Sequence, residues 1–119
     1  MNSHELQERL IAFSTSVIKI TETLASTTAG KNLSNQLVRS ATSVSLNYGE
    51  AQSGESRKDF VHKLRIVLKE LRETYAGLRL VETTCSVDDP FQVKNVIKES
   101  NELIAIFVAS IRTASAKLQ

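Results

Sequence analysis

Apolar residues recur at alternating spacings of four and three in four successive stretches of this 119-residue chain. The first stretch shows this rhythm most clearly, with Leu6, Leu10, Phe13, Val17, Ile20 and Leu24. Because an α-helix has about 3.6 residues per turn, the spacing places these side chains along one side of a helix. Such a stripe must pack against other helices to leave water, so the pattern predicts an all-α fold.

The four stretches predict four helices in a single domain spanning residues 1–119, with approximate bounds of 4–26, 33–52, 57–85 and 90–118. One proline and four glycines leave few places for turns, so the connections are expected to be short. Short connections join neighbouring helices that run in opposite directions. The pattern therefore favours an antiparallel, up-down-up-down four-helix bundle.

Residues that favour helix ends flank these stretches. Asn2 is an expected N-cap, and Asp89 followed by Pro90 is the clearest start signal in the chain. Gly30 is the expected end of the first helix, and Gly54 ends the second.

The sequence carries no arrangement typical of an enzyme. It has no P-loop, dinucleotide-binding glycine motif, nucleophile elbow or Cys-x-x-Cys pair. Asp59 and His62 are spaced as in carboxylate-bridged di-iron bundles, but a second such pair is missing and the apolar stripe points both away from the core. We expect an exposed surface pair here, and no catalysis, cofactor, metal or small-molecule substrate.

One side of the expected third helix, roughly opposite its apolar stripe, carries a line of basic residues, counting one histidine: Lys58, His62, Arg65, Lys69, Arg72 and Arg79. This basic line is either a solvated surface, partly neutralised by Glu70 and Glu73, or a face that contacts the phosphates of RNA or DNA. No aromatic residue interleaves the line, so stacking on bases is not expected. Binding there would follow charge and shape rather than base sequence.

Apolar residues in excess of the stripes indicate contacts between copies of the chain. In the first helix Ile11 and Ile18 lie seven residues apart outside the stripe, and Ala25 continues the row. Beside a stripe that includes Ile97 and Ile104, the fourth helix adds Val96, Leu103 and Ile106. A single chain would expose such rows, which then mark a contact surface. Alternatively, they only widen the core stripe.

Net charge and hydropathy exclude several further classes of protein. Fifteen Lys and Arg against 13 Asp and Glu give a net charge of +2, well below that of a protein dedicated to coating nucleic acid. No apolar run approaches the ~20 residues that span a bilayer, and the polar N-terminus is unlike a signal peptide. The single Cys85 cannot form an internal disulfide. A cytoplasmic protein without membrane contact is expected.

The stretch 36–51 contains Arg-Ser-Ala-x-Ser followed by Asn-x-x-Glu, and Phe60 and a Leu-x-Glu block come later. In this order the blocks closely resemble the bacterial four-helix-bundle family named after proteins encoded in intervening sequences of large-subunit ribosomal RNA genes. The resemblance implies a bundle without enzymatic activity that assembles as a ring, commonly a homopentamer. The recurrent polar positions of the family correspond to Arg39, Asn47, Glu50 and Glu73.

Arg39 is expected to pair with Glu50 or Glu73, within one chain or between chains, or else to face water. The chain departs from the common family reading Asn-Ile-Ala-Glu-Gly, since it has Tyr48, Gly49 and Ala51. The family is also similar to the strongly basic accessory protein of diversity-generating retroelements, which binds nucleic acid and a reverse transcriptase. Two hypotheses follow: a self-associating bundle of undefined cellular role, or an accessory protein that binds RNA or DNA.

Overall fold

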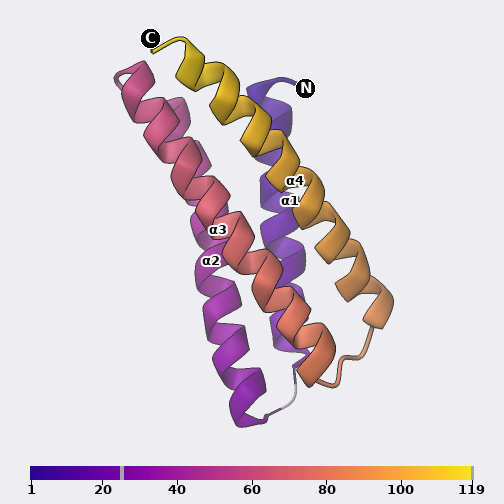
Figure 1. Cartoon of the computed structure of the whole chain (residues 1–119). Helices are drawn as coiled ribbons and strands as arrows, with labels where there is room; N and C mark the ends of the chain where they lie inside the picture. Colours follow the sequence, from indigo (N-terminus) through magenta and orange to yellow (C-terminus); the bar gives the residue numbers. More distant parts are fainter. Residues whose placement is uncertain (25, 119) are drawn as a thin grey trace.

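The computed structural model describes residues 1–24 and 26–118 as four antiparallel helices, with both chain ends at the same end of the molecule (Figure 1). The helices are α1 (Ser3–Glu22), α2 (Thr28–Gln52), α3 (Arg57–Thr84) and α4 (Pro90–Ala116). The described residues contain no strand, so the expected all-α bundle is confirmed. None of these helices is long and apolar enough to cross a membrane.

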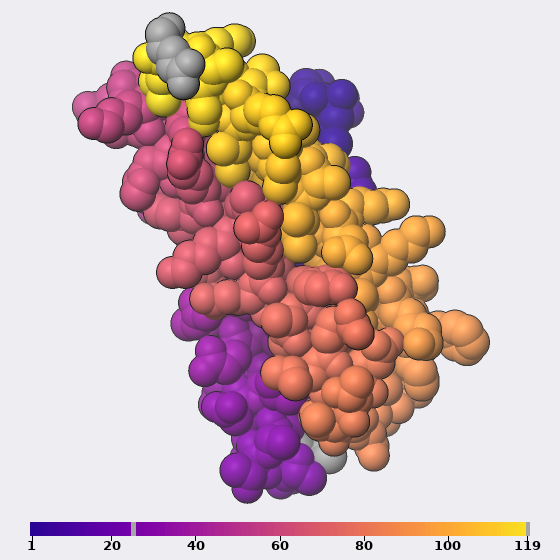
Figure 2. All heavy atoms as spheres, viewed as in Figure 1, coloured from indigo at the N-terminus to yellow at the C-terminus, as the bar shows by residue number. Residues whose placement is uncertain are grey.

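The helices pack as a square in the order α1, α2, α3, α4 and back to α1, which makes the molecule an elongated body of 48 × 22 × 21 Å. α3 therefore lies diagonally opposite α1. The packing is uneven around the square, since α2 and α3 contact each other most and α1 and α4 least. Most of the face seen in Figure 2 is made by α3 and α4, with α2 beside them.

The core is mostly aliphatic and runs the length of the bundle. Its largest fully buried side chains come from all four helices and include Leu10, Leu37, Leu71 and Phe107. Tyr48 and Phe107 meet edge to face across the core, with ring centroids 5.6 Å apart, a favoured geometry for aromatic pairs. Burial raises the pKa of Tyr48 above its ordinary value.

The starts of three helices follow local signals in the sequence. The side chains of Asn2, Ser56 and Asp89 each accept a hydrogen bond from the backbone N–H three residues further on, as N-caps do. Pro90 occupies the first turn of α4, where its missing N–H has no intrahelical partner to lose.

The junction between α1 and α2 differs from the sequence prediction. α1 ends at Glu22 rather than near residue 26, and α2 starts at Thr28 rather than Leu33. Gly30 does not stop the first helix, because the Thr27 hydroxyl accepts the Gly30 N–H and makes Thr27 the N-cap of α2. Gly30 is therefore a buried residue in the first turn of α2.

The side of α4 that faces the core also differs from the prediction. Val96 and Leu103, expected on the surface of a single chain, are only 5% and 0% exposed and belong to the core. Ile97 and Ile104, expected in the stripe, are only partly buried. α4 packs against both α1 and α3 and buries Val93, Ser100 and Phe107 as expected, but with Val96 and Leu103 in place of Ile97 and Ile104. Val96 and Leu103 are therefore not available as contacts between intact copies.

Candidate interaction surfaces

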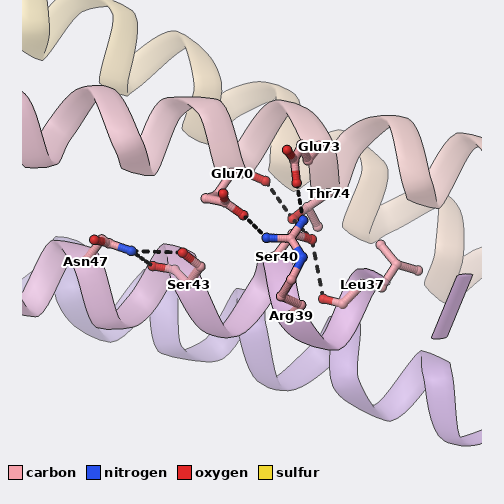
Figure 3. Close-up of polar contacts among 8 residues, drawn as sticks. All are labelled: Leu37, Arg39, Ser40, Ser43, Asn47, Glu70, Glu73 and Thr74. Carbon is pink, nitrogen blue, oxygen red and sulfur yellow. Dashed lines mark hydrogen bonds and ion pairs between the residues drawn. The ribbon is translucent and has the colours of Figure 1, made fainter. Parts of the chain in front are cut away.

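A polar cluster joins α2 to α3 near the middle of the bundle (Figure 3). Arg39 donates to Glu70 Oε2 at 3.1 Å and also forms an ion pair with Glu73, one of its two expected partners. Hydrogen bonding to Glu73 raises the pKa of Arg39 above its ordinary value, so the guanidinium keeps its charge. Glu50, the other expected partner, instead accepts from Lys63 Nζ at 2.8 Å.

Buried hydroxyl groups continue this cluster into the core. Thr74 Oγ1 lies 2.8 Å from Ser40 Oγ and 2.8 Å from the carbonyl oxygen of Glu70. One turn along α3, Gly77 lets α2 come close, because a Cβ at this position would lie 2.8 Å from Leu37 Cδ2. The cluster therefore holds two helices together, and its hydroxyls and charges are engaged in that task.

Asn47, the last of the four polar positions suggested by the family resemblance, contacts a residue of its own helix. The side-chain amide of Asn47 donates to the carbonyl oxygen of Ser43 at 2.9 Å and lies 2.8 Å from its hydroxyl (Figure 3). Asp59 and His62 are exposed. Within residues 1–24 and 26–118, no group of three or more His, Cys, Asp or Glu side chains is arranged to hold a metal ion.

All six residues of the basic line are exposed along the outer side of α3. Among described residues, Lys58, Lys69 and Arg72 form no ion pair, so their charges face solvent. Arg65 donates to the Ser115 hydroxyl at 3.1 Å and therefore leans toward α4. Most of the positive charge of the line is thus free to meet an anionic partner.

At one end of the basic line, the charge of Arg79 already has partners within the chain. Its guanidinium lies 3.8 Å from Glu82 and donates to the Tyr75 hydroxyl at 3.0 Å. It also lies 5.8 Å from the centre of the Tyr75 ring. Tyr75 is thus an aromatic neighbour that sequence reasoning missed, although it lies between Arg72 and Arg79. Because Arg79 already lies over it, one face of this ring is not free to stack on a base.

The outer side of the α1–α2 pair carries four large apolar side chains that we call the apolar ridge: Ile11, Ile18, Val38 and Leu46. Leu46 is 63% exposed and Ile18 is partly buried. Ser14 Oγ lies 2.6 Å from Ser45 Oγ and donates to the Ala41 carbonyl at 2.7 Å, which sets the register of the two helices. This register places Ile11 at the height of Leu46 and Ile18 at the height of Val38 along the bundle.

The ridge contains two of the five contact residues expected from the sequence. Ile106, a third, is partly buried on α4, and Ala25 lies outside the described residues. Sequence reasoning missed Val38 and Leu46. The available signal was the low charge of α2, where Arg39 is the only charged residue between Lys31 and Glu50.

A shallow groove follows the sparse seam between α1 and α4. Its two parts have volumes of about 210 and 160 Å³ and share Gln92. The first is lined by α1 residues from Ala12 to Ser16, and the second by α1 residues from Lys19 to Thr23. We call this feature the α1–α4 groove.

An ion-pair cluster closes one end of the α1–α4 groove. Arg9 donates to both carboxylate oxygens of Glu99, at 2.6 and 2.8 Å, and to Glu102 at 3.0 Å. The hydrogen bond from Arg9 lowers the pKa of Glu99 below its ordinary value. Two-point contacts of this kind are directional, so the cluster fixes the spacing of α1 and α4 where their packing is thin.

These features define a small helical-bundle protein whose polar clusters join its helices and whose outer faces carry the candidate sites. Residues 3–109 match the family described as 23S rRNA-intervening sequence protein. The chain belongs to this family, which confirms the resemblance seen in the sequence.

A solved structure supports the same fold. It is the 1.70 Å crystal structure of a protein with unknown function from the S23 ribosomal protein family of Bacteroides thetaiotaomicron VPI-5482. The two chains are 25% identical, and the similarity covers 94% of this chain and 99% of the other with a TM-score of 0.77. Among curated proteins, none matches the chain.

Proposed function

We propose that the chain is a non-catalytic structural or interaction protein that associates with copies of itself to form a ring. The family resemblance suggests the ring, and the apolar ridge is the observation that supports self-association. Its four branched side chains come from the two helices of one face, and the α1 segment between Arg9 and Glu22 carries a single charged residue, Lys19, which lines the α1–α4 groove on the other side of α1. Contiguous exposed apolar surface of this kind is typical of contact sites.

The proposal is tested by the mass of the protein in solution, measured by light scattering after size-exclusion chromatography. The wild type is expected to elute as a multimer, and Leu46→Glu as a monomer because a charge replaces the most exposed side chain of the ridge. Leu80→Glu is the matched control, since Leu80 is 51% exposed on α3, away from the ridge. A monomeric wild type, or equal effects of the two substitutions, would contradict the proposal.

A second candidate function is binding to the backbone of RNA or DNA through the basic line. The specific observation in its favour is that Lys58, Lys69 and Arg72 are exposed and form no ion pair with the described residues. Basic side chains without acidic partners release counterions when they meet phosphates. The low net charge of the chain limits its affinity for nucleic acid, so binding would be weak and strongly dependent on salt.

Titration of a labelled structured RNA at two salt concentrations tests this candidate. The double substitution Arg65→Glu with Arg72→Glu is expected to abolish binding. The matched control changes the same two residues to lysine, which keeps both charges and should keep most of the affinity. Absence of binding at low salt, or binding that survives the change to glutamate, would leave the basic line as solvated surface.

A further inference from the structure

We infer that the copies associate head to tail, with the apolar ridge of one copy seated in the α1–α4 groove of the next. This inference rests on the self-association proposed above, and it adds which two surfaces meet. The ridge protrudes from one side of α1, whereas the groove lies on the other side of the same helix. Two different patches in contact generate a ring or an open filament, in contrast to the closed pair that results when one patch meets itself.

The heights of the two patches along the bundle distinguish a ring from a filament. A closed ring relates its copies by rotation without any shift along the axis, so the two patches must lie at the same height. On α1 the ridge extends from Ile11 to Ile18, and the residues that line the groove begin at Ala12 and end at Thr23. The groove is longer than the ridge and lies level with it, as closure requires.

The angle between the two faces points to a small ring. Neighbouring faces of a square bundle point about 90° apart, whereas opposite faces point about 180° apart and would build a straight filament. Closure with four copies needs contact faces about 90° apart, and closure with five copies needs about 108°. The faces α1–α2 and α1–α4 share α1 and are neighbours, so a small closed ring fits them and a straight filament does not.

The charges at the loop end of the two patches are complementary. Exposed Glu22 and Lys31 border the ridge, while exposed Lys19 and Asp88 border the groove. Among described residues none of these four forms an ion pair within the chain. When neighbouring copies stand at equal height, Glu22 of one copy faces Lys19 of the next. Lys31 likewise faces Asp88, so both contacts join opposite charges.

The groove can receive the ridge because two of the three α1 residues in its larger part are small. Ala12 and Ser16 line the larger part of the groove beside Phe13 and leave room for branched side chains from outside. Like the middle of the ridge, the α1 wall of this part carries no charged side chain. The branched side chains of a second copy therefore fit this part of the groove. In the resulting ring α1 faces the centre and α3 faces outward.

Two variants with complementary defects test the inference. Leu46→Glu damages only the ridge, and Ala12→Arg, at an exposed helical position, fills only the groove. Each variant alone is expected to be monomeric, and circular dichroism and urea denaturation check that each is folded. An equimolar mixture retains one intact ridge and one intact groove, so sedimentation velocity should show a species of twice the monomer mass.

The outcomes separate this inference from the proposed function. If Leu46→Glu dissociates the wild-type multimer but Ala12→Arg leaves its mass unchanged, self-association stands and the head-to-tail arrangement is wrong. A mixture that remains monomeric at concentrations well above those at which the wild type assembles would also refute it. If the wild type itself is a monomer, both statements fail.

A charge exchange gives an independent check. Lys19→Glu places two carboxylates opposite each other and should weaken self-association on the order of fivefold per contact. Adding Glu22→Lys to the same chain restores opposite charges between neighbours and should recover most of the loss. If the second substitution brings no recovery, Glu22 and Lys19 do not face each other.

Discussion

Replacing Leu103 by alanine tests which side of α4 faces the core. Leu103 is fully buried and Ile104 is partly exposed, although the apolar rhythm alone assigns them the opposite way. Leu→Ala removes three carbon groups worth roughly 0.8 kcal/mol each, and the cavity left behind raises the cost to about 3 kcal/mol. The Ile104 side chain is already partly in contact with water. Ile104→Ala therefore removes less buried surface and should lower the free energy of unfolding by only about 1 kcal/mol.

Urea unfolding at fixed protein concentration measures both effects. With a slope of about 2 kcal/mol per molar urea, Leu103→Ala should lower the midpoint by about 1.5 M and Ile104→Ala by about 0.5 M. The measurement is repeated after tenfold dilution, because the loss at a contact between copies depends on concentration and the loss at a core residue does not. Equal losses, a larger loss at Ile104, or a loss at Leu103 that changes on dilution would refute the reasoning.

Three further predictions concern polar groups, and urea unfolding measures each of them. Thr74→Val should cost about 1–2 kcal/mol because the buried Ser40 hydroxyl loses a partner, and adding Ser40→Ala should recover part of the loss. Glu99→Gln should cost about 1 kcal/mol at pH 7. Because Arg9 lowers the pKa of Glu99 in the folded state, this stabilisation is present above the ordinary glutamate pKa of about 4.3 and is lost as the pH falls from there through the lowered pKa. Asp89→Ala should cost about 1 kcal/mol through loss of the N-cap of α4, and a loss near zero would argue against the cap.

The number of helices and the starts of most of them were predictable because their signals are local. A cap residue such as Asn2 or Asp89 acts on the backbone N–H groups of its own first turn, so neighbouring sequence is enough to find it. The start of α2 was harder, since several Ser and Thr residues lie together before it and only Thr27 caps the helix. Gly30 then appeared to be an end signal although it lies inside the helix.

The buried side of α4 could be predicted only in part, since Val93, Ser100 and Phe107 are buried as expected but Ile97 and Ile104 are not. Val96 and Ile97 are both apolar and adjacent, as are Leu103 and Ile104, so either member of each pair fits the same rhythm. Which stripe is buried depends on how far α1 and α3 cover α4, and that is a property of the packed bundle. For a similar reason, only two of the four ridge residues were predicted. Ile11 and Ile18 form a row on one helix, whereas Leu46 joins them only through the register of α1 with α2.

The uneven packing of the square sets the order in which its parts open. α2 and α3, locked by Gly77 and the Arg39 cluster, should keep their amide protons longest in hydrogen exchange. α1 meets α4 sparsely and relies there on Arg9, so we expect α1 to detach first in a single chain. A ring that holds α1 from both sides would slow exchange most in the helix that is otherwise the least protected.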